Sequence, residues 1–288
     1  MTLIKGHYRI VGASPDGDSV KFYPEDTGVW ARAGITVKAN STGGVQLRLD
    51  AIDALETHYT PPRARAAWRQ PAALGDAASA RLLELLGFRR VTRDDRGVVT
   101  ASSPDAAPGY ILSGFGDKYG RAVATAFAGG RRGRAADGSS VWLDTEELRR
   151  SANHHLLREG LVYPTFYSKL FYDLREELAA TAVAARDARR GVWADDCTLP
   201  GFSLVSRKQL TDQLVILPKL FRRLAEFLSL DETGKASLTG FPAFLAAQDD
   251  RLFTVPSGQS TSFDTLVEVR RQTVRLTVPP EQIVFQEG

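Results

Sequence analysis

The sequence predicts an α+β fold that is mainly a small closed β-barrel. Short apolar stretches and helical patterns follow one another in the order strand-strand-strand, helix, strand-strand, helix, helix. No alternation of single strands with helices is visible, and this absence favours a barrel over a parallel sheet. The 288 residues, 43% of them hydrophobic, are enough for one large or two modest domains.

The first three strands are expected from apolar alternation and from turn residues. A strand over residues 7–13 is followed by a turn at Asp16-Gly17 and a return strand over 19–23. A third strand is expected over 45–52, where a period of two places Arg48 on the face opposite Leu47 and Leu49.

The middle of the chain is expected to contain three helices and further strands. Apolar spacing predicts helices over 73–88, 144–160 and 172–190, and strands are expected over 98–113 and 122–127. Asp144 is the expected cap of the second helix.

The character of the sequence changes after Trp193. A boundary near 197 separates residues 1–197 from residues 198–288. The latter region predicts an amphipathic helix over 207–230 that Pro218 interrupts, an apolar helix at "FPAFLAAQ", and late strands over 253–285. No chemistry is recognisable in this region, and it is a candidate surface for a homo-oligomer or a protein partner.

Charge and cysteine content leave several classes of protein open. The chain has 37 Lys and Arg against 34 Asp and Glu, a net charge of +3, which neither demands nor excludes a polyanionic partner. The single Cys197 rules out an intrachain disulfide framework. The start, MTLIKGHYRIVGAS, contains no apolar core of a signal peptide, and no segment is apolar enough to cross a membrane. We therefore expect a soluble cytoplasmic protein that does not bind membranes, although a cysteine-poor exported protein would have the same composition.

Five charged residues could together serve phosphodiester cleavage. The carboxylates of Asp18 and Asp53 could hold a hard divalent cation such as calcium, and Glu56 could orient or deprotonate a water. The guanidinium groups of Arg48 and Arg121 could each bind phosphate oxygens through parallel N–H donors. Taken singly, each residue also fits a turn, a polar loop or a surface strand.

The order of these motifs resembles the staphylococcal nuclease (thermonuclease) family. The resemblance extends from roughly residue 5 to residue 196. The matching segments are Asp16-Gly17-Asp18-Ser19-Val20-Lys21, Arg48-Leu49, Ile52-Asp53-Ala54, Glu56-Thr57, Asp117-Lys118-Tyr119-Gly120-Arg121, Ala152-Asn153, Gly160-Leu161 and Gly191-Val192-Trp193.

The resemblance implies a five-stranded OB-fold barrel with about three helices, and calcium-dependent cleavage of DNA, single- or double-stranded, and of RNA. Magnesium and manganese remain open as alternative cations. The roles implied position by position are metal binding for Asp18, Asp53 and the carbonyl of Ala54; water activation for Glu56; phosphate and transition-state binding for Arg48 and Arg121; nucleotide contacts for Lys118 and Tyr119; and terminal phosphate and sugar contacts for Tyr163 and Tyr167.

Some features of the chain depart from the family or fit two interpretations. The family commonly has proline where Leu55 stands, and Phe166 competes with the tyrosines for one of their two positions. The run Arg131-Arg132-Gly133-Arg134 fits a solvated loop or a nucleic-acid contact. Two classes of function stay open: an active nuclease, or a nuclease-like module that binds nucleic acid or protein without cleaving.

Overall fold

The computed structural model describes residues 1–130, 135–231, 236–255 and 257–286 and forms two compact units. The barrel unit comprises Met1–Asp50 and Ala78–Leu156, and the composite unit comprises Ala51–Ala77 and Leu157–Gly288. Within the described ranges, no helix is both long and apolar enough to cross a membrane.

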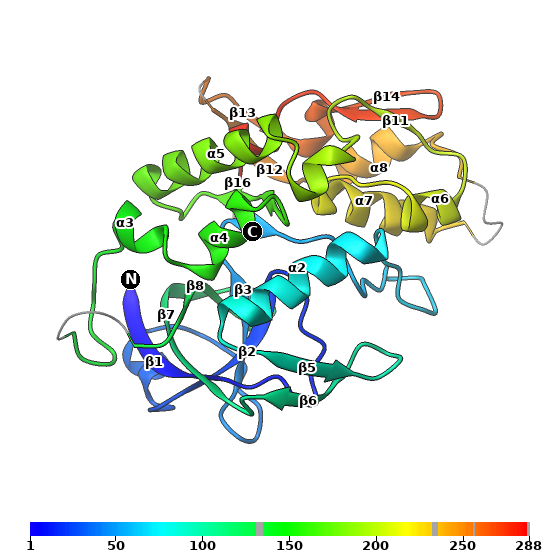
Figure 1. Cartoon of the computed structure of the whole chain (residues 1–288). Helices are drawn as coiled ribbons and strands as arrows, with labels where there is room; N and C mark the ends of the chain where they lie inside the picture. Colours follow the sequence, from blue (N-terminus) through cyan, green and yellow to red (C-terminus); the bar gives the residue numbers. More distant parts are fainter. Residues whose placement is uncertain (131–134, 232–235, 256, 287–288) are drawn as a thin grey trace. The chain divides into compact units, whose positions relative to one another are not determined.

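The barrel unit contains a closed five-stranded barrel (Figure 1). Its strand order is β1-β2-β3-β8-β7, with β3 and β8 parallel and the other neighbours antiparallel. This closed Greek-key order is that of an OB fold, as predicted. Its elements are β1 (Thr2–Tyr8), β2 (Ser19–Pro24), α1 (Val29–Arg32), β3 (Val45–Leu49), β5 (Arg90–Arg93), β6 (Val99–Ser103), β7 (Ala107–Gly116), β8 (Ala122–Ala128) and α3 (Thr145–Leu148).

Buried and partly exposed side chains alternate along the barrel strand β3. In β3 the buried Val45, Leu47 and Leu49 alternate with the partly exposed Gln46 and Arg48, so the face predicted for the arginine is confirmed. The predicted first strand was wrong, because β1 begins at Thr2 rather than at residue 7. Its burial pattern is irregular at the start, where two successive residues are buried, and this hides the period of two on which the prediction relied.

The helix predicted over 144–160 is two helices, α3 and α4 (Ala152–Arg158). Asp144 caps α3 as expected, because its carboxylate accepts the N–H of Glu147 at 2.7 Å. The break follows from Ser151, whose buried hydroxyl oxygen accepts the N–H of His154 at 3.1 Å and so starts a second helix.

Asn153 binds α4 to the barrel. Its side chain is 1% exposed. The amide oxygen accepts the N–H of Ala126 at 3.0 Å, and the amide nitrogen donates to the carbonyls of Asp50 at 2.9 Å and Ala124 at 3.2 Å. One side chain thus satisfies three backbone groups of β8 and of the segment that follows β3.

The composite unit combines a segment near residue 60 with the C-terminal part of the chain. Its elements are β4 (Ile52–Asp53), β9 (Tyr163–Pro164), β10 (Phe166–Tyr167), α5 (Tyr172–Asp187), η1 (Gly191–Ala194), β11 (Phe202–Ser203), α6 (Arg207–Asp212), α7 (Pro218–Leu228), α8 (Phe241–Ala247), β12 (Arg251–Thr254), β13 (Ser260–Ser262), η2 (Phe263–Leu266), β14 (Val267–Arg270), β15 (Thr273–Leu276), η3 (Pro280–Gln282) and β16 (Ile283–Phe285). Helix α2 (Ala72–Leu85) begins in this unit and ends in the barrel unit.

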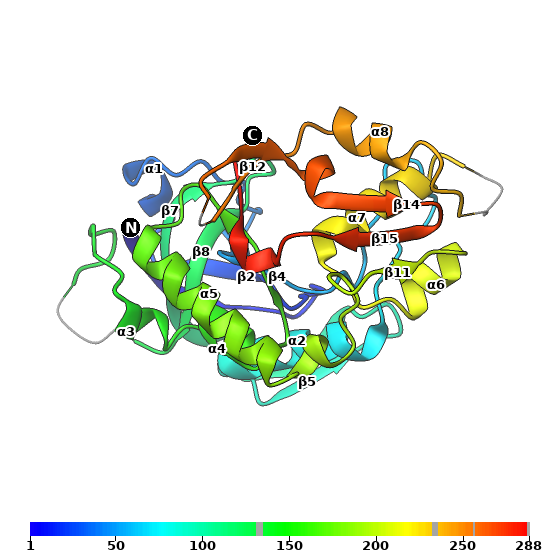
Figure 2. The ribbon, with the colours of Figure 1, turned by 90° about the horizontal axis from the view of Figure 1, so that it is seen from above.

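Small sheets and helices of the composite unit surround a common core. One sheet has the order β10-β16-β12-β13 and another the order β11-β15-β14, and the strands β14 and β15 lie side by side in Figure 2. The helix predicted over 207–230 is interrupted as expected, because Pro218 stands at the first position of α7, where its missing N–H is tolerated.

The region 198–288 shares its core with residues from the earlier part of the chain. Leu55, Trp68, Tyr163 and Trp193 belong to the same hydrophobic cluster as the side chains of α7, α8 and β15. The parallel pairing of β10 with β16 joins the two parts further. The functional boundary at residue 197 stays a prediction, but packing does not follow it.

We expect Asn153→Ala to lower the free energy of unfolding by about 2–4 kcal/mol, because the N–H of Ala126 and the carbonyls of Asp50 and Ala124 would each lose a hydrogen bond in a buried place. Urea titration of the purified variant measures this. Arg150→Ala, on an exposed ion pair of the preceding turn, is the control and should change stability by less than about 0.5 kcal/mol. Equal losses in the two variants would contradict the role given to Asn153.

Candidate functional site

Three of the predicted residues lie on, or directly before, neighbouring strands of the barrel unit. The register pairs Ser19 of β2 with Arg48 of β3, and Arg48 with Val123 of β8. The carbonyl of Asp18 accepts the N–H of Leu49 at 2.7 Å. Arg121 directly precedes β8, two residues before Val123, so the alternation of the strand returns it to the face of Arg48. The structure therefore brings Asp18, Arg48 and Arg121 to one region of the barrel.

The turn Asp117-Lys118-Tyr119-Gly120-Arg121 is built to orient its arginine. One carboxylate oxygen of Asp117 accepts the N–H groups of Tyr119 at 3.0 Å and Arg121 at 2.9 Å, and the other accepts Nε of Arg121 at 2.7 Å. Gly120 has φ of +84°, and a Cβ there would stand 2.5 Å from Cγ of Lys38. The guanidinium is thereby held by a rigid turn rather than by a free side chain.

Lys118 presents a cation to solvent, and Tyr119 presents an aromatic ring. The side chain of Tyr119 is 63% exposed. Nζ of Lys118 and Cζ of Arg121 each lie 5.5 Å from the centre of its ring. An exposed ring between cations is suited to stacking on a base, although the predicted nucleotide contact stays a prediction.

The acidic loop of residues 53–56 belongs to the composite unit. Asp53 ends the short strand β4, where it pairs with Tyr163 of β9. The preceding Ala51 has φ of +67°, and its carbonyl accepts the N–H of Thr165 at 2.9 Å. Asp53 is 3% exposed and Ala54 is 4% exposed. This bend and the pairing with β9 fix the backbone that carries the buried Asp53.

Arg222 of α7 binds the two carboxylates of this loop. Its Nη1 and Nη2 atoms donate to Oδ1 and Oδ2 of Asp53 at 3.1 and 2.7 Å, and Nη1 also donates to Oε1 of Glu56 at 2.5 Å. Burial by itself lowers the pKa of Arg222, but the charges of Asp53 and Glu56 outweigh burial and hold the pKa well above its usual value. Sequence reasoning missed this residue. Its only signal was an arginine on an amphipathic helix, the same signal that surface arginines give.

The backbone around Glu56 is fixed by Gln70, which is 1% exposed. The side-chain oxygen of Gln70 accepts the N–H of Glu56 at 3.1 Å, its backbone N–H donates to the carbonyl of Glu56 at 2.7 Å, and its amide nitrogen donates to the carbonyl of Ile216 at 2.8 Å. A single buried amide thus connects the acidic loop to the segment that leads into α7.

The two tyrosines expected to contact substrate have different surroundings. Tyr163 is fully buried, packs against Trp193 and donates its hydroxyl to Asp196 at 2.7 Å. These contacts account for it as a core residue, and its predicted substrate contact gains no support from them. Tyr167 is partly exposed, and its ring lies 5.8 Å from that of Phe285.

The predicted site residues therefore fall into a barrel set and a composite set. The prediction that both sets meet at one phosphate stays a prediction, as does the metal-binding role of Asp18, Asp53 and Ala54. The described ranges contain no group of three His, Cys, Asp or Glu side chains arranged for a metal ion, but the predicted ligand set has only two carboxylates. The run of residues 131–134 lies outside the described residues.

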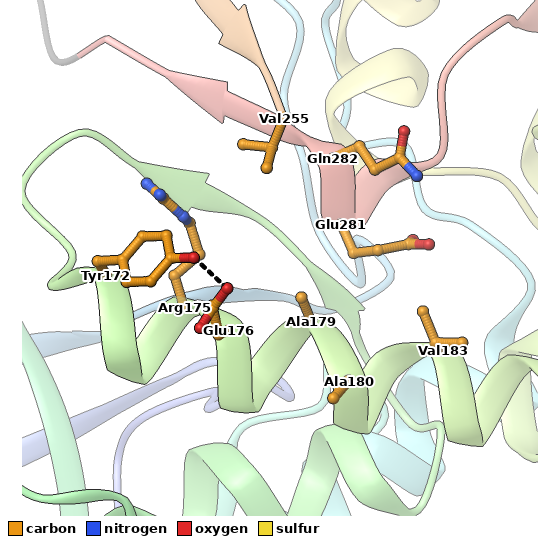
Figure 3. Close-up of a pocket in the computed structure, with 9 residues that line it drawn as sticks. All are labelled: Tyr172, Arg175, Glu176, Ala179, Ala180, Val183, Val255, Glu281 and Gln282. Carbon is orange, nitrogen blue, oxygen red and sulfur yellow. Dashed lines mark hydrogen bonds between the residues drawn. The ribbon is translucent and has the colours of Figure 1, made fainter. Parts of the chain in front are cut away.

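A shallow pocket of the composite unit lies beside α5 and η3 (Figure 3). Ala179, Ala180 and Val183 form its apolar side. The polar groups at its rim are engaged within the chain, because Tyr172 donates its hydroxyl to Glu176 and Arg186 donates to Glu281 at 2.7 Å. We assign this pocket no role.

Two substitutions of Asp117 should separate the turn from the ion pair. Asp117→Ala removes the acceptor of two backbone N–H groups and should lower the free energy of unfolding by about 1–3 kcal/mol. Asp117→Asn keeps that acceptor through its amide oxygen, but it loses both the negative charge and the second oxygen that accepts Nε–H of Arg121, which should cost less than about 1 kcal/mol. Urea titrations of both variants test this. Equal costs would mean that the carboxylate does not organise the turn.

Comparison with known proteins agrees with the barrel topology and with the motif order. The family model described as "Staphylococcal nuclease homologue" matches residues 46–195, just over half of the chain. A search of curated proteins finds none that matches. On the strength of the family match and the closed five-stranded barrel, the chain belongs to the family of staphylococcal nuclease homologues.

Proposed function

We propose that the protein is a nuclease that hydrolyses phosphodiester bonds of DNA, and also of RNA, by attack of water on a phosphate bound by Arg48 and Arg121. The observation that carries this proposal is the register of β2, β3 and β8, because Arg48 lies on β3 between two strands that Asp18 and Arg121 directly precede. Membership of a nuclease-type family supports it.

The two arginines suit the proposed chemistry. A phosphate under attack gains negative charge on its equatorial oxygens, and fixed guanidinium donors stabilise that charge. Arg121 is held by Asp117 at 2.7 Å, so it is preorganised before substrate binds. In this proposal Arg121 also assists departure of the 5′-oxygen, and Glu56 orients or deprotonates the attacking water.

Calcium is the proposed cation, and the carboxylates of Asp18 and Asp53 with the carbonyl of Ala54 are oxygen donors of the kind it prefers. When bound, such an ion lends positive charge to the phosphate oxygens and to water. Both oxygens of Asp53 are bound to Arg222 in this structure. Calcium binding at Asp53 therefore requires that this guanidinium withdraw.

One observation favours the alternative function, a module that binds nucleic acid or protein without cleaving it. Arg222 forms ion pairs with both Asp53 and Glu56, at 2.7 and 2.5 Å. A carboxylate held by a guanidinium is a poor general base, because the bound cation stabilises its charged form. Under this alternative the arginines of the barrel set would bind phosphate and no bond would be cut.

Cleavage assays distinguish the two functions. Heat-denatured DNA, duplex DNA and RNA are each incubated with the protein and calcium, and then with a chelator. We expect degradation that the chelator stops, and a rate at least ~10²-fold lower for Arg121→Lys and for Arg48→Lys, since lysine cannot reproduce two parallel donors.

Arg96→Lys, at an arginine 85% exposed on a loop, is the control and should cleave at the wild-type rate. Binding of DNA in a fluorescence assay without cleavage of any substrate, with or without calcium, would reject the enzyme and favour the binding module.

A further inference from the structure

Arg222 makes the contact that a divalent cation would be expected to make. Its two terminal nitrogens face the two oxygens of Asp53, and one of them also binds Glu56. This parallel, two-bond pairing is the strongest arrangement that arginine and a carboxylate can form. Arg222 lies far outside the part of the chain that the family model matches, which ends at residue 195.

The pairing is partly buried, so solvent screens it less than it screens a pair on the surface. The exposed fractions of the side chains are 22% for Arg222, 4% for Asp53 and 18% for Glu56. An exposed pair of this kind contributes little, whereas breaking a pair with one nearly buried member, here Asp53, is more costly.

The helix that carries Arg222 is itself anchored in the core. On α7 the residues Leu220, Phe221 and Leu224 are completely buried. Leu55, in the middle of the acidic loop, belongs to the same hydrophobic cluster. The packing of Leu55 therefore fixes the acidic loop against the core that contains α7.

Two further contacts connect the acidic loop and the residues that follow it to α7 and to the segment just before α7. Tyr59 donates its hydroxyl to Glu226 at 2.5 Å, and Gln70 links the backbone of Glu56 to Ile216. These contacts hold both α7, which carries Arg222, and the acidic loop, which carries Asp53, in place.

We propose that Arg222 is an internal cation that competes with a divalent metal ion for Asp53 and Glu56, so that the C-terminal region holds the acidic loop in a metal-free state. The inference rests on the metal-binding role given to Asp53 under the proposed function. A calcium ion needs several oxygens at about 2.3–2.6 Å. It cannot take those of Asp53 while a second positive charge lies against the same atoms, because the two cations repel each other.

Calcium binding in the absence of substrate tests the competition. Isothermal titration of Arg222→Gln with calcium should give an affinity roughly tenfold or more above that of the wild-type protein, in the range of ordinary coupling between two binding events. The melting temperature of the variant should also rise more on addition of calcium. Manganese is titrated in parallel.

Arg223→Gln is the matched control. Arg223 is on the same helix, has a side chain 17% exposed, and forms ion pairs with Asp250 and Glu226 at 2.6 Å. This variant loses comparable contacts and should bind calcium as the wild-type protein does. Equal gains in both variants, or no gain for Arg222→Gln, would overturn the competition.

Two further variants test whether the ion binds at Asp53 and whether misfolding explains the effect of Arg222→Gln. Asp53→Asn introduced into Arg222→Gln should abolish the gain, and a gain that survives would overturn the proposal. Arg222→Lys keeps a positive charge but loses the parallel donors. It should fold, as judged by circular dichroism, and bind calcium with an affinity between those of the wild-type protein and Arg222→Gln. An affinity for Arg222→Lys no higher than that of the wild-type protein would count against competition.

Failure of the two proposals can be told apart. If Arg222→Gln gains calcium affinity at Asp53 but cleaves neither DNA nor RNA, the competition stands and the nuclease function is rejected. If the wild-type protein cleaves with calcium and Arg222→Gln binds it no more tightly, the nuclease function stands and the competition is rejected.

Discussion

The composite unit depends on the compensation of one buried charge. Asp53 is 3% exposed, and an ionised carboxylate in such a position costs several kcal/mol unless a partner offsets its charge. Arg222 supplies that partner from 169 positions along the chain. The ion pair with Arg222 therefore favours this conformation of the loop when α7 is folded beside it. Leu55 and Gln70 then pack and bond in the same place.

The polar side of α7 is used for internal pairing rather than for solvent. Lys219 donates to Asp250 at 2.7 Å and Arg223 binds Asp250 and Glu226, while Glu226 accepts the hydroxyl of Tyr59. Burial lowers the pKa of Lys219 to about 8 even though Asp250 counteracts it. This amphipathic helix thus has a buried apolar side and a partly buried ionic side, and Arg222 on the ionic side pairs with the acidic loop.

The spacing of apolar residues and the turn residues predicted those elements whose conformation depends mainly on nearby residues. The strands β2, β3 and β8 and the helices α2 and α5 follow from period and turn residues. The start of β1 does not, because two successive buried residues break its alternation. The division of residues 144–160 depends on the single hydroxyl of Ser151, which helical periodicity does not reveal.

The candidate site could be predicted only in part. Its residue types and their order were visible in the sequence, because turn chemistry and strand alternation place Asp18, Arg48 and Arg121. The partner of Asp53 was not visible. Pairing over such a distance is set by how α7 packs, and no local spacing connects Arg222 with Glu56. The burial of Tyr163 was hidden for the same reason, because Trp193 covers it from a distant segment.

The shared core around Leu55, Trp68, Tyr163 and Trp193 has a consequence for anyone who shortens this chain. A fragment ending near residue 197 would keep every residue that marks the family, yet it would lose the apolar covering of those four side chains and the counter-charge of Asp53. Such a fragment would expose an apolar surface and would aggregate more readily than the intact protein. The C-terminal region thus covers apolar side chains that belong to the part of the chain matched by the family model.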